Sequence, residues 1–87
     1  MSEATTLFTI EQVAVRCGVE VTYVRRLVQT GVIEPDPEQP EHFRPEVTLR
    51  VQKAARLEDD LGVNAEGIAV ILDLLDQIDR LERRLRR

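Results

Sequence analysis

Apolar residues recur along this chain with the period of an α-helix, and helix-ending signals divide the pattern into segments. The first segment covers 10–17, with Thr9 and Gln12 at the spacing of a capping box and Gly18 as a stop. The second has the same period and stops at Gly31. Its apolar residues are Val21, Val24, Leu27 and Val28. Two short helices joined by a tight glycine-containing link predict a helix-turn-helix.

A proline-rich acidic stretch follows at 34–41, and its three prolines exclude both a helix and regular strand pairing. We therefore expect an exposed loop that returns through a short extended segment at 42–44. Phe43 is the only large apolar side chain of this return, so we expect it to anchor the loop to the core. Such a loop beside a helix-turn-helix is a wing.

A third helix is predicted from Pro45, because a proline suits the first helical position, to the residue before Gly62. Asn64 then caps a last helix over 65–87, which spans about 35 Å at about 1.5 Å per residue. The expected buried stripe of the third helix is Val47, Val51, Ala54, Leu57 and Leu61.

The last helix carries two apolar faces. Ile68, Leu72 and Leu75 have the spacing needed to close a domain core. A second set alternates spacings of three and four, as in a coiled coil, and we call it the seam. The seam consists of Ile71, Leu74, Ile78, Leu81 and Leu85. We expect it to contact a partner or a second copy, so that the chain forms a homodimer.

The pattern thus predicts one domain overall, with a winged helix-turn-helix core and third helix over 1–62 and the seam-bearing helix over 63–87. The chain has 87 residues, of which 43% are hydrophobic, and no apolar run approaches the roughly 20 residues that cross a bilayer. Its start lacks the features of a signal peptide, and one cysteine cannot form an internal disulfide. We therefore expect a cytoplasmic protein that does not bind membranes.

Charge divides the chain unevenly. Residues 1–46 hold four basic against eight acidic side chains, a net charge of −4, while residues 47–87 hold eight of each. An acidic half repels the phosphate backbone of nucleic acid, so DNA is a disfavoured partner.

Catalytic chemistry has no support in the sequence. The single cysteine, Cys17, falls at the end of the first helix, where we expect a core role, and the single histidine, His42, falls in the wing. These two residues cannot build a tetrahedral metal site or a nucleophile–base pair within one chain. We expect no enzyme, metal, cofactor or small-molecule substrate.

Several segments resemble a known family. The stretches 9–14, 18–19 and 31–33 resemble the opening of MerR-type winged-helix proteins. More narrowly, 31–35, 51–57 and 67–81 resemble the CbpM-type chaperone modulators of bacteria. The resemblance implies an all-α, MerR-like winged helix-turn-helix with a small wing and a long C-terminal helix. It also implies that the protein binds the J-domain of a DnaJ-like co-chaperone and inhibits its action on DnaK.

Three acids are candidates for partner binding. Glu58 and Asp59 lie at the C-terminal end of the third helix, where the helix dipole disfavours negative charge, and such broken local rules point to function. The resemblance adds that J-domains present a basic helix, which an acidic patch would complement. Asp73 has only Gln77 four residues on, and is free to meet a partner. A solvated acidic helix end, kept for solubility, is the alternative.

Three acid-first i, i+4 ion pairs are expected further along the last helix. They are Asp76–Arg80, Asp79–Arg83 and Glu82–Arg86. We expect these residues to satisfy one another rather than a partner.

Two other functions stay open: a DNA-binding MerR-type regulator acting as a dimer, and a purely structural dimerisation module. DNA contacts would come from Arg25, Arg26, Gln29 and Arg44. DNA-binding MerR proteins carry aromatic residues after the first of these arginines and a basic wing, and both features are missing here.

Overall fold

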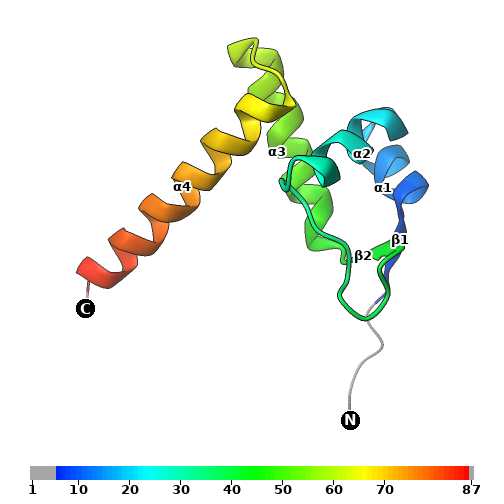
Figure 1. Cartoon of the computed structure of the whole chain (residues 1–87), viewed down its shortest axis with the longest axis horizontal. Helices are drawn as coiled ribbons and strands as arrows, with labels where there is room; N and C mark the ends of the chain where they lie inside the picture. The colour runs from blue at the N-terminus through cyan, green and yellow to red at the C-terminus, as the bar shows by residue number, and fades with distance from the viewer. Residues whose placement is uncertain (1–5, 87) are drawn as a thin grey trace.

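The structure of the protein is a computed structural model, in which residues 6–86 are described (Figure 1). This part of the chain contains helices α1 (Ile10–Cys17), α2 (Val21–Gln29), α3 (Glu46–Leu61) and α4 (Ala65–Leu85), and strands β1 (Phe8–Thr9) and β2 (His42–Phe43). The predicted helices are confirmed, with starts within one residue of those expected. The mostly helical winged helix-turn-helix fold with a long last helix is also confirmed.

Local signals at α1 act as predicted. The Gln12 backbone N–H donates to Thr9 Oγ1 at 3.2 Å, and the Thr9 backbone N–H donates to Gln12 Oε1 at 2.9 Å, which completes the capping box. Val13 of α1 and Val24 and Leu27 of α2 are buried, so the two helices share one core. This packing forms the helix-turn-helix.

A short antiparallel sheet ties the wing to the start of α1. Phe8 lies opposite Phe43, and Thr9 lies opposite His42. Phe43 is buried, which confirms its role as an anchor. The strand β1 was not predicted, because two residues are too short to show the alternating pattern of a strand.

The wing is organised around the buried side chain of Asp36. Its carboxylate accepts hydrogen bonds from the backbone N–H groups of Glu38 and Gln39, both at 3.1 Å, and from Arg44 Nε at 2.8 Å. Its own backbone N–H donates to the carbonyl of His42 at 2.8 Å. The hydrogen bond from Arg44 and those from the two backbone N–H groups hold the pKa of Asp36 below its ordinary value. An aspartate that bonds the backbone two and three residues on is a common way to fix a turn.

Helix α3 leads from the wing to the far end of the domain. Pro45 has helical dihedral angles directly before the helix, and Gly62, with φ of 68°, ends it in the left-handed region that favours glycine. Val51 and Ala54 are buried, but Leu61 is 55% exposed, so its predicted place in the buried stripe is wrong. The last turn of α3 lies beyond α1 and α2 (Figure 1), and the helical period does not show where neighbouring helices end.

Helix α4 packs on the domain through its N-terminal half only. Asn64 Oδ1 accepts the Gly67 backbone N–H at 2.9 Å, which confirms the predicted cap, and Ile68 and Leu72 are buried. Leu75 is 41% exposed, so its predicted core role is wrong; among the described residues of α4, the core extends to Leu72. The radius of gyration is 14.2 Å, against about 12 Å for a compact chain of this length. Most of the C-terminal half of α4 therefore protrudes (Figure 1).

Arg50 of α3 connects α4 to the domain. Its Nε donates to the carbonyl of Val32 at 2.6 Å, and its NH2 group pairs with Asp76 of α4 at 3.0 Å. The predicted Asp76–Arg80 pair is therefore wrong, since Asp76 is turned toward the domain.

The other two pairs predicted along α4 have different outcomes. Asp79–Arg83 is confirmed. Within residues 6–86 no ion pair joins Glu82 to Arg86, so that prediction is wrong.

No helix within the described range combines the length and the apolar character that crossing a membrane requires.

Candidate functional site

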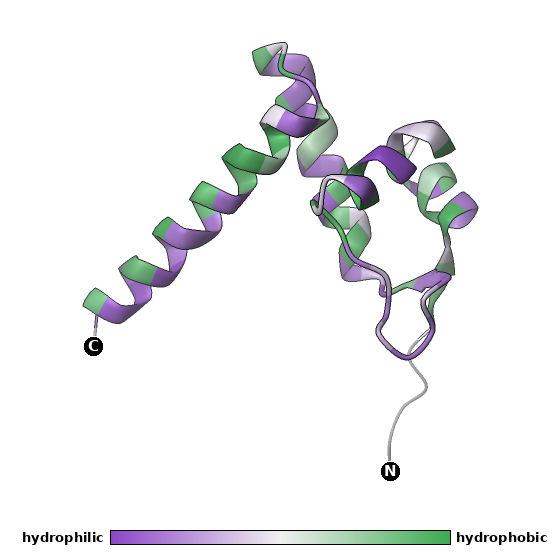
Figure 2. Cartoon of the chain, viewed as in Figure 1, coloured by the Kyte–Doolittle hydropathy of each residue, from purple (hydrophilic) through white to green (hydrophobic). Residues whose placement is uncertain are grey.

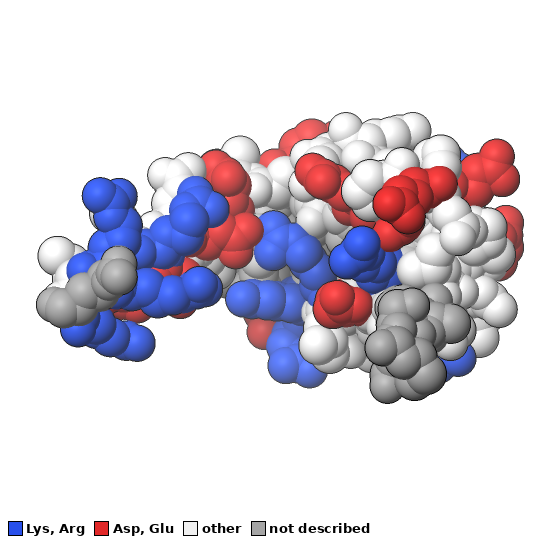
Figure 3. Space-filling model, turned by 90° about the horizontal axis from the view of Figure 1, so that it is seen from below, with Lys and Arg blue, Asp and Glu red and all other residues white. Residues whose placement is uncertain are grey.

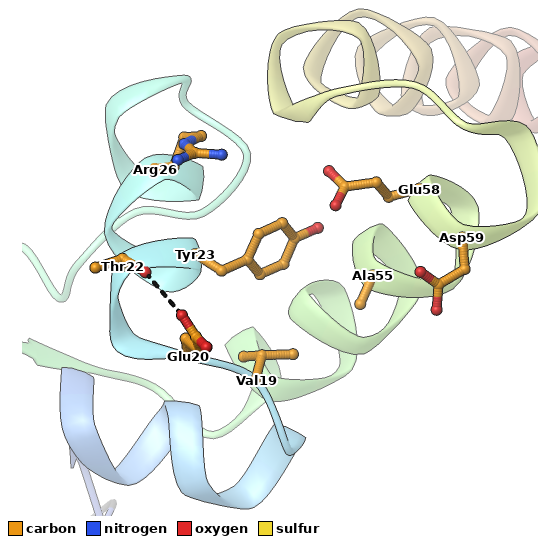
Figure 4. Close-up of a pocket in the computed structure, with 8 residues that line it drawn as sticks. All are labelled: Val19, Glu20, Thr22, Tyr23, Arg26, Ala55, Glu58 and Asp59. Carbon is orange, nitrogen blue, oxygen red and sulfur yellow. Dashed lines mark hydrogen bonds between the residues drawn. The ribbon is translucent and has the colours of Figure 1, made fainter.

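An open cleft of about 370 Å³ lies between α2 and the C-terminal half of α3 (Figure 4). We call it the α2–α3 cleft. Its lining residues are Val19, Glu20, Thr22, Tyr23, Arg26, Ala55, Glu58 and Asp59. Two of the three predicted partner-binding residues, Glu58 and Asp59, therefore lie on one concave surface.

The cleft has an excess of negative charge. It presents the carboxylates of Glu20, Glu58 and Asp59 and a single guanidinium, that of Arg26. None of these four side chains takes part in an ion pair with another residue of the described chain. Among the described residues, the Glu20 carboxylate accepts a single long hydrogen bond of 3.5 Å, from the hydroxyl of Thr22 (Figure 4). The carboxylates are thus available to a positively charged partner.

Tyr23 extends from α2 across the cleft, and its hydroxyl points toward Glu58 (Figure 4). This hydroxyl is buried and has no hydrogen-bond partner among residues 6–86. Burial raises the pKa of Tyr23, the negative charges of Glu58 and Asp59 raise it further, and Arg26 acts in the opposite direction. The hydroxyl therefore keeps its proton at neutral pH.

Sequence reasoning missed Glu20 and Tyr23. A weak signal was present, because Glu20, Tyr23 and Arg26 are spaced three residues apart and so share one side of α2. That side lies against the acidic end of α3 only through tertiary packing, which residue spacing does not reveal.

The third predicted partner-binding residue, Asp73, lies in a different hollow. It accepts a hydrogen bond from Gln77 Nε2 at 2.8 Å, the neighbour expected from its spacing. The hollow measures about 390 Å³ and is bounded by 31–34, the N-terminal half of α3 and α4. It shares no lining residue with the α2–α3 cleft, so the structure does not bring Asp73 together with Glu58 and Asp59.

The seam follows the outer side of α4. Ile71 is half-buried against the domain, whereas Leu74, Ile78, Leu81 and Leu85 are between 51% and 83% exposed. In Figure 2 the C-terminal half of this helix is hydrophobic along one side and hydrophilic along the other. The described chain therefore leaves most of the seam uncovered.

The four residues of the alternative DNA surface do not act as a group. Arg25, Arg26 and Gln29 are exposed on α2, whereas Arg44 is exposed on the wing and paired with the buried Asp36. Figure 3 shows basic side chains at the free end of α4 and a second group in the middle of the same face. Arg44 is the one Lys or Arg of residues 34–44, and it is paired with Asp36, so the wing lacks the basic surface that phosphate binding needs.

Cys17 has a structural position. It packs against the core, and its Sγ donates to the carbonyl of Thr48 at 3.5 Å. Burial raises the pKa of its thiol, which disfavours the reactive thiolate. No group of three or more histidine, cysteine or acidic residues in the described range is arranged to hold a metal ion.

Comparisons with known proteins identify the family. The profile described as MerR HTH family regulatory protein matches residues 8–87. A protein named Chaperone modulatory protein CbpM from Salmonella paratyphi B is 36% identical over 83 residues, which cover 93% of this chain and 82% of the relative. Proteins of the same name from Citrobacter koseri and Escherichia coli O1:K1 are 34% and 33% identical over 85 residues, with 95% of this chain and 84% of each relative covered. The chain belongs to the CbpM family of chaperone modulatory proteins.

Membership of the CbpM family confirms the resemblance found in the sequence. It also agrees with the winged helix-turn-helix fold, since the matching profile is that of MerR-type helix-turn-helix regulators. The names of these relatives describe modulators and regulators rather than enzymes. An acidic cleft without a nucleophile–base pair is consistent with a protein that acts by binding.

Proposed function

We propose that this CbpM-family protein binds the J-domain of a DnaJ-like co-chaperone and inhibits its action on DnaK in the bacterial cytoplasm. The observation that carries the proposal is the α2–α3 cleft, where Glu58 and Asp59 face a partner without an ion pair in the described chain. A basic helix, such as J-domains present, has the complementary charge. The relatives' name, chaperone modulatory protein, indicates the same class of partner.

The proposed mechanism is occlusion. A J-domain whose basic helix is covered by this protein cannot present that helix to DnaK, so ATP hydrolysis by DnaK is no longer stimulated. Opposite charges on the two surfaces accelerate association and select the partner more than they determine the final affinity. The protein needs no catalytic group for this action.

The direct test is calorimetry of this protein against the J-domain of its host's co-chaperone, together with DnaK ATPase measured with the co-chaperone present. We expect a one-to-one complex and a loss of stimulated ATPase that follows its saturation. The absence of a complex at micromolar concentrations would reject the proposal.

A charge-reversal variant tests the surface. Glu58→Lys with Asp59→Lys should weaken J-domain binding by about 1 kcal/mol or more, because favourable charge contacts become repulsive. The thermal midpoint should hold or rise slightly, since positive charge suits the C-terminal end of a helix. The control is Glu38→Lys with Glu41→Lys, which reverses two exposed acids of the wing. Equal loss in both variants would mean that only net charge matters.

A second function is favoured by the exposed Arg25, Arg26 and Gln29 on α2 and by the helix-turn-helix family. In this alternative the protein is a DNA-binding MerR-type regulator that acts as a dimer. A gel-shift with the promoter of its own operon at physiological salt separates the two functions. We expect no sequence-specific shift, because the wing is acidic and its arginine is paired with Asp36.

A further inference from the structure

A second hollow borders α2 on the side away from the α2–α3 cleft, between the wing and the start of α1. It measures about 390 Å³, and we call it the wing groove. Its apolar lining residues are Ile10, Val28, Pro35, Pro40 and Phe43. The surface exposed within the wing groove is mostly apolar, whereas the α2–α3 cleft presents mainly charged groups.

The wing groove is formed by parts of the fold that hold one another in place. The pairing of β1 with β2 joins the wing to the start of α1. The carboxylate of Asp36 accepts hydrogen bonds from the wing backbone between Pro35 and Pro40. Ile10 and Val28 are half-buried and pack against the core. A groove that exists before binding needs little ordering when a partner enters, which favours affinity.

Helix α2 is the ridge between the two hollows. Tyr23 and Arg26, three residues apart, line the α2–α3 cleft, whereas Arg25 and Val28, also three apart, line the wing groove. A helix with its side chains is about 10–12 Å across. A partner that lies over α2 therefore meets the acidic cleft on one side and the apolar groove on the other.

The charges at the rim narrow the chemistry of what enters the groove. Arg25 is the one arginine or lysine that lines it, and Glu11 and Glu41 border it as well. None of these three side chains takes part in an ion pair within residues 6–86. The complement is an apolar side chain with charged neighbours of both signs. A protein surface offers this pattern, whereas the backbone of nucleic acid is negative throughout.

We propose that the wing groove receives one apolar side chain of the J-domain, and that Arg25 at the rim pairs with a carboxylate beside that side chain. The inference rests on the proposed function, because the J-domain is the partner attracted by the α2–α3 cleft. It adds an apolar anchor to an interface that otherwise depends on charge. Anchors of this kind, seated in a pocket, commonly carry much of the affinity of an interface.

Two variants test the groove. Val28→Thr adds a hydroxyl to its wall at nearly unchanged size, and Pro40→Ser removes an apolar surface from the exposed tip of the wing. Each should weaken J-domain binding, by about tenfold for Val28→Thr, because an apolar contact is lost. The control is Val15→Thr, an exposed valine of α1 outside the groove, which should change affinity less than twofold. Wild-type affinity in both groove variants would reject the anchor.

The dependence of affinity on salt separates the anchor from the charged rim. Arg25→Gln should weaken binding severalfold at about 0.1 M salt and much less at about 1 M, because salt screens exposed ion pairs. The loss caused by Val28→Thr should be the same at both concentrations. A loss for Val28→Thr that disappears at high salt would contradict an apolar anchor.

Nuclear magnetic resonance of the wild-type complex locates the contact directly. Methyl groups of Ile10 and Val28 should show intermolecular nuclear Overhauser effects to the J-domain, whereas those of Val15 should not. If the J-domain binds and the methyl groups of the groove show no such effect, the anchor is wrong and the proposed function stands. If the wild type does not bind at all, both are wrong.

Discussion

Asp36 fixes the wing through a single carboxylate, and this makes the wing sensitive to acid. Because the pKa of Asp36 is lowered in the folded protein, its contribution to stability is present above the unfolded value, about 3.9, and is lost as pH falls through the folded value. Asp36→Asn should therefore lower the thermal midpoint at pH 7, while the two proteins should converge as pH falls through the folded pKa of Asp36. Thermal melts across this range test the prediction.

The control for that experiment is Glu38→Gln, which neutralises an exposed acid on the same wing. It should leave the midpoint close to wild type at every pH. A difference between Asp36→Asn and wild type that persisted undiminished in acid would contradict the assigned role, because protonated Asp36 no longer holds Arg44 as an ion pair.

Residue-level prediction succeeded where the chemistry is local. Thr9 and Asn64 were recognised as caps because their hydrogen bonds span only three residues. It failed where the partner is distant along the chain. Asp76 pairs with Arg50, 26 residues earlier, and no helical spacing could indicate that pair. The unpartnered hydroxyl of Tyr23 was equally hidden, since it results from the packing of two helices.

At the level of elements, the contact of Arg50 with Asp76 adds a polar contact to the apolar packing that holds α4 against the domain. Asp76→Asn should lower the free energy of unfolding by about 0.5 kcal/mol or less. The side chains of Arg50 and Asp76 are 34% and 48% exposed, so solvent screens the pair. Hydrogen exchange in the first half of α4 should accelerate. Asp79→Asn, which breaks an exposed pair within the same helix, should affect only the free end. If hydrogen exchange in the first half of α4 were equal in the two variants, the Arg50–Asp76 pair would not help to hold α4 against the domain.

Element boundaries were predictable because capping residues and glycines mark them in the sequence. The extent of the buried faces was less predictable than the boundaries. Leu61 and Leu75 both continue the apolar period of their helices, yet both are exposed. The period tells which side of a helix is apolar, but the point at which that side stops being covered depends on the neighbouring elements. This limit explains why the extent of the core was overestimated at the ends of α3 and α4.

On the scale of the whole molecule, the sequence predicted the fold and only part of the candidate site. Glu58 and Asp59 stood out because acids are unfavourable at a helix C-terminus, and they do line a cleft. Asp73 was chosen for its lack of an ion-pair partner, and it faces another hollow. Which charged residues share a surface is decided by how α2, α3 and α4 are arranged, and this arrangement was not readable from spacing.

The exposed part of the seam leads to a prediction about assembly. We propose that two copies pair through α4, because a protruding apolar helix face is a liability in water and self-association is a common way to bury it. An antiparallel pair is favoured, since it sets Arg83 and Arg84 of one copy near Asp73 of the other, whereas a parallel pair would stack the arginines.

Ile78→Asp should convert a dimer into a monomer in sedimentation equilibrium, with helicity largely retained. The control is Asp79→Asn, which changes the residue next to Ile78 but outside the seam and should remain dimeric. If the wild type is monomeric at high micromolar concentration, the seam serves another partner.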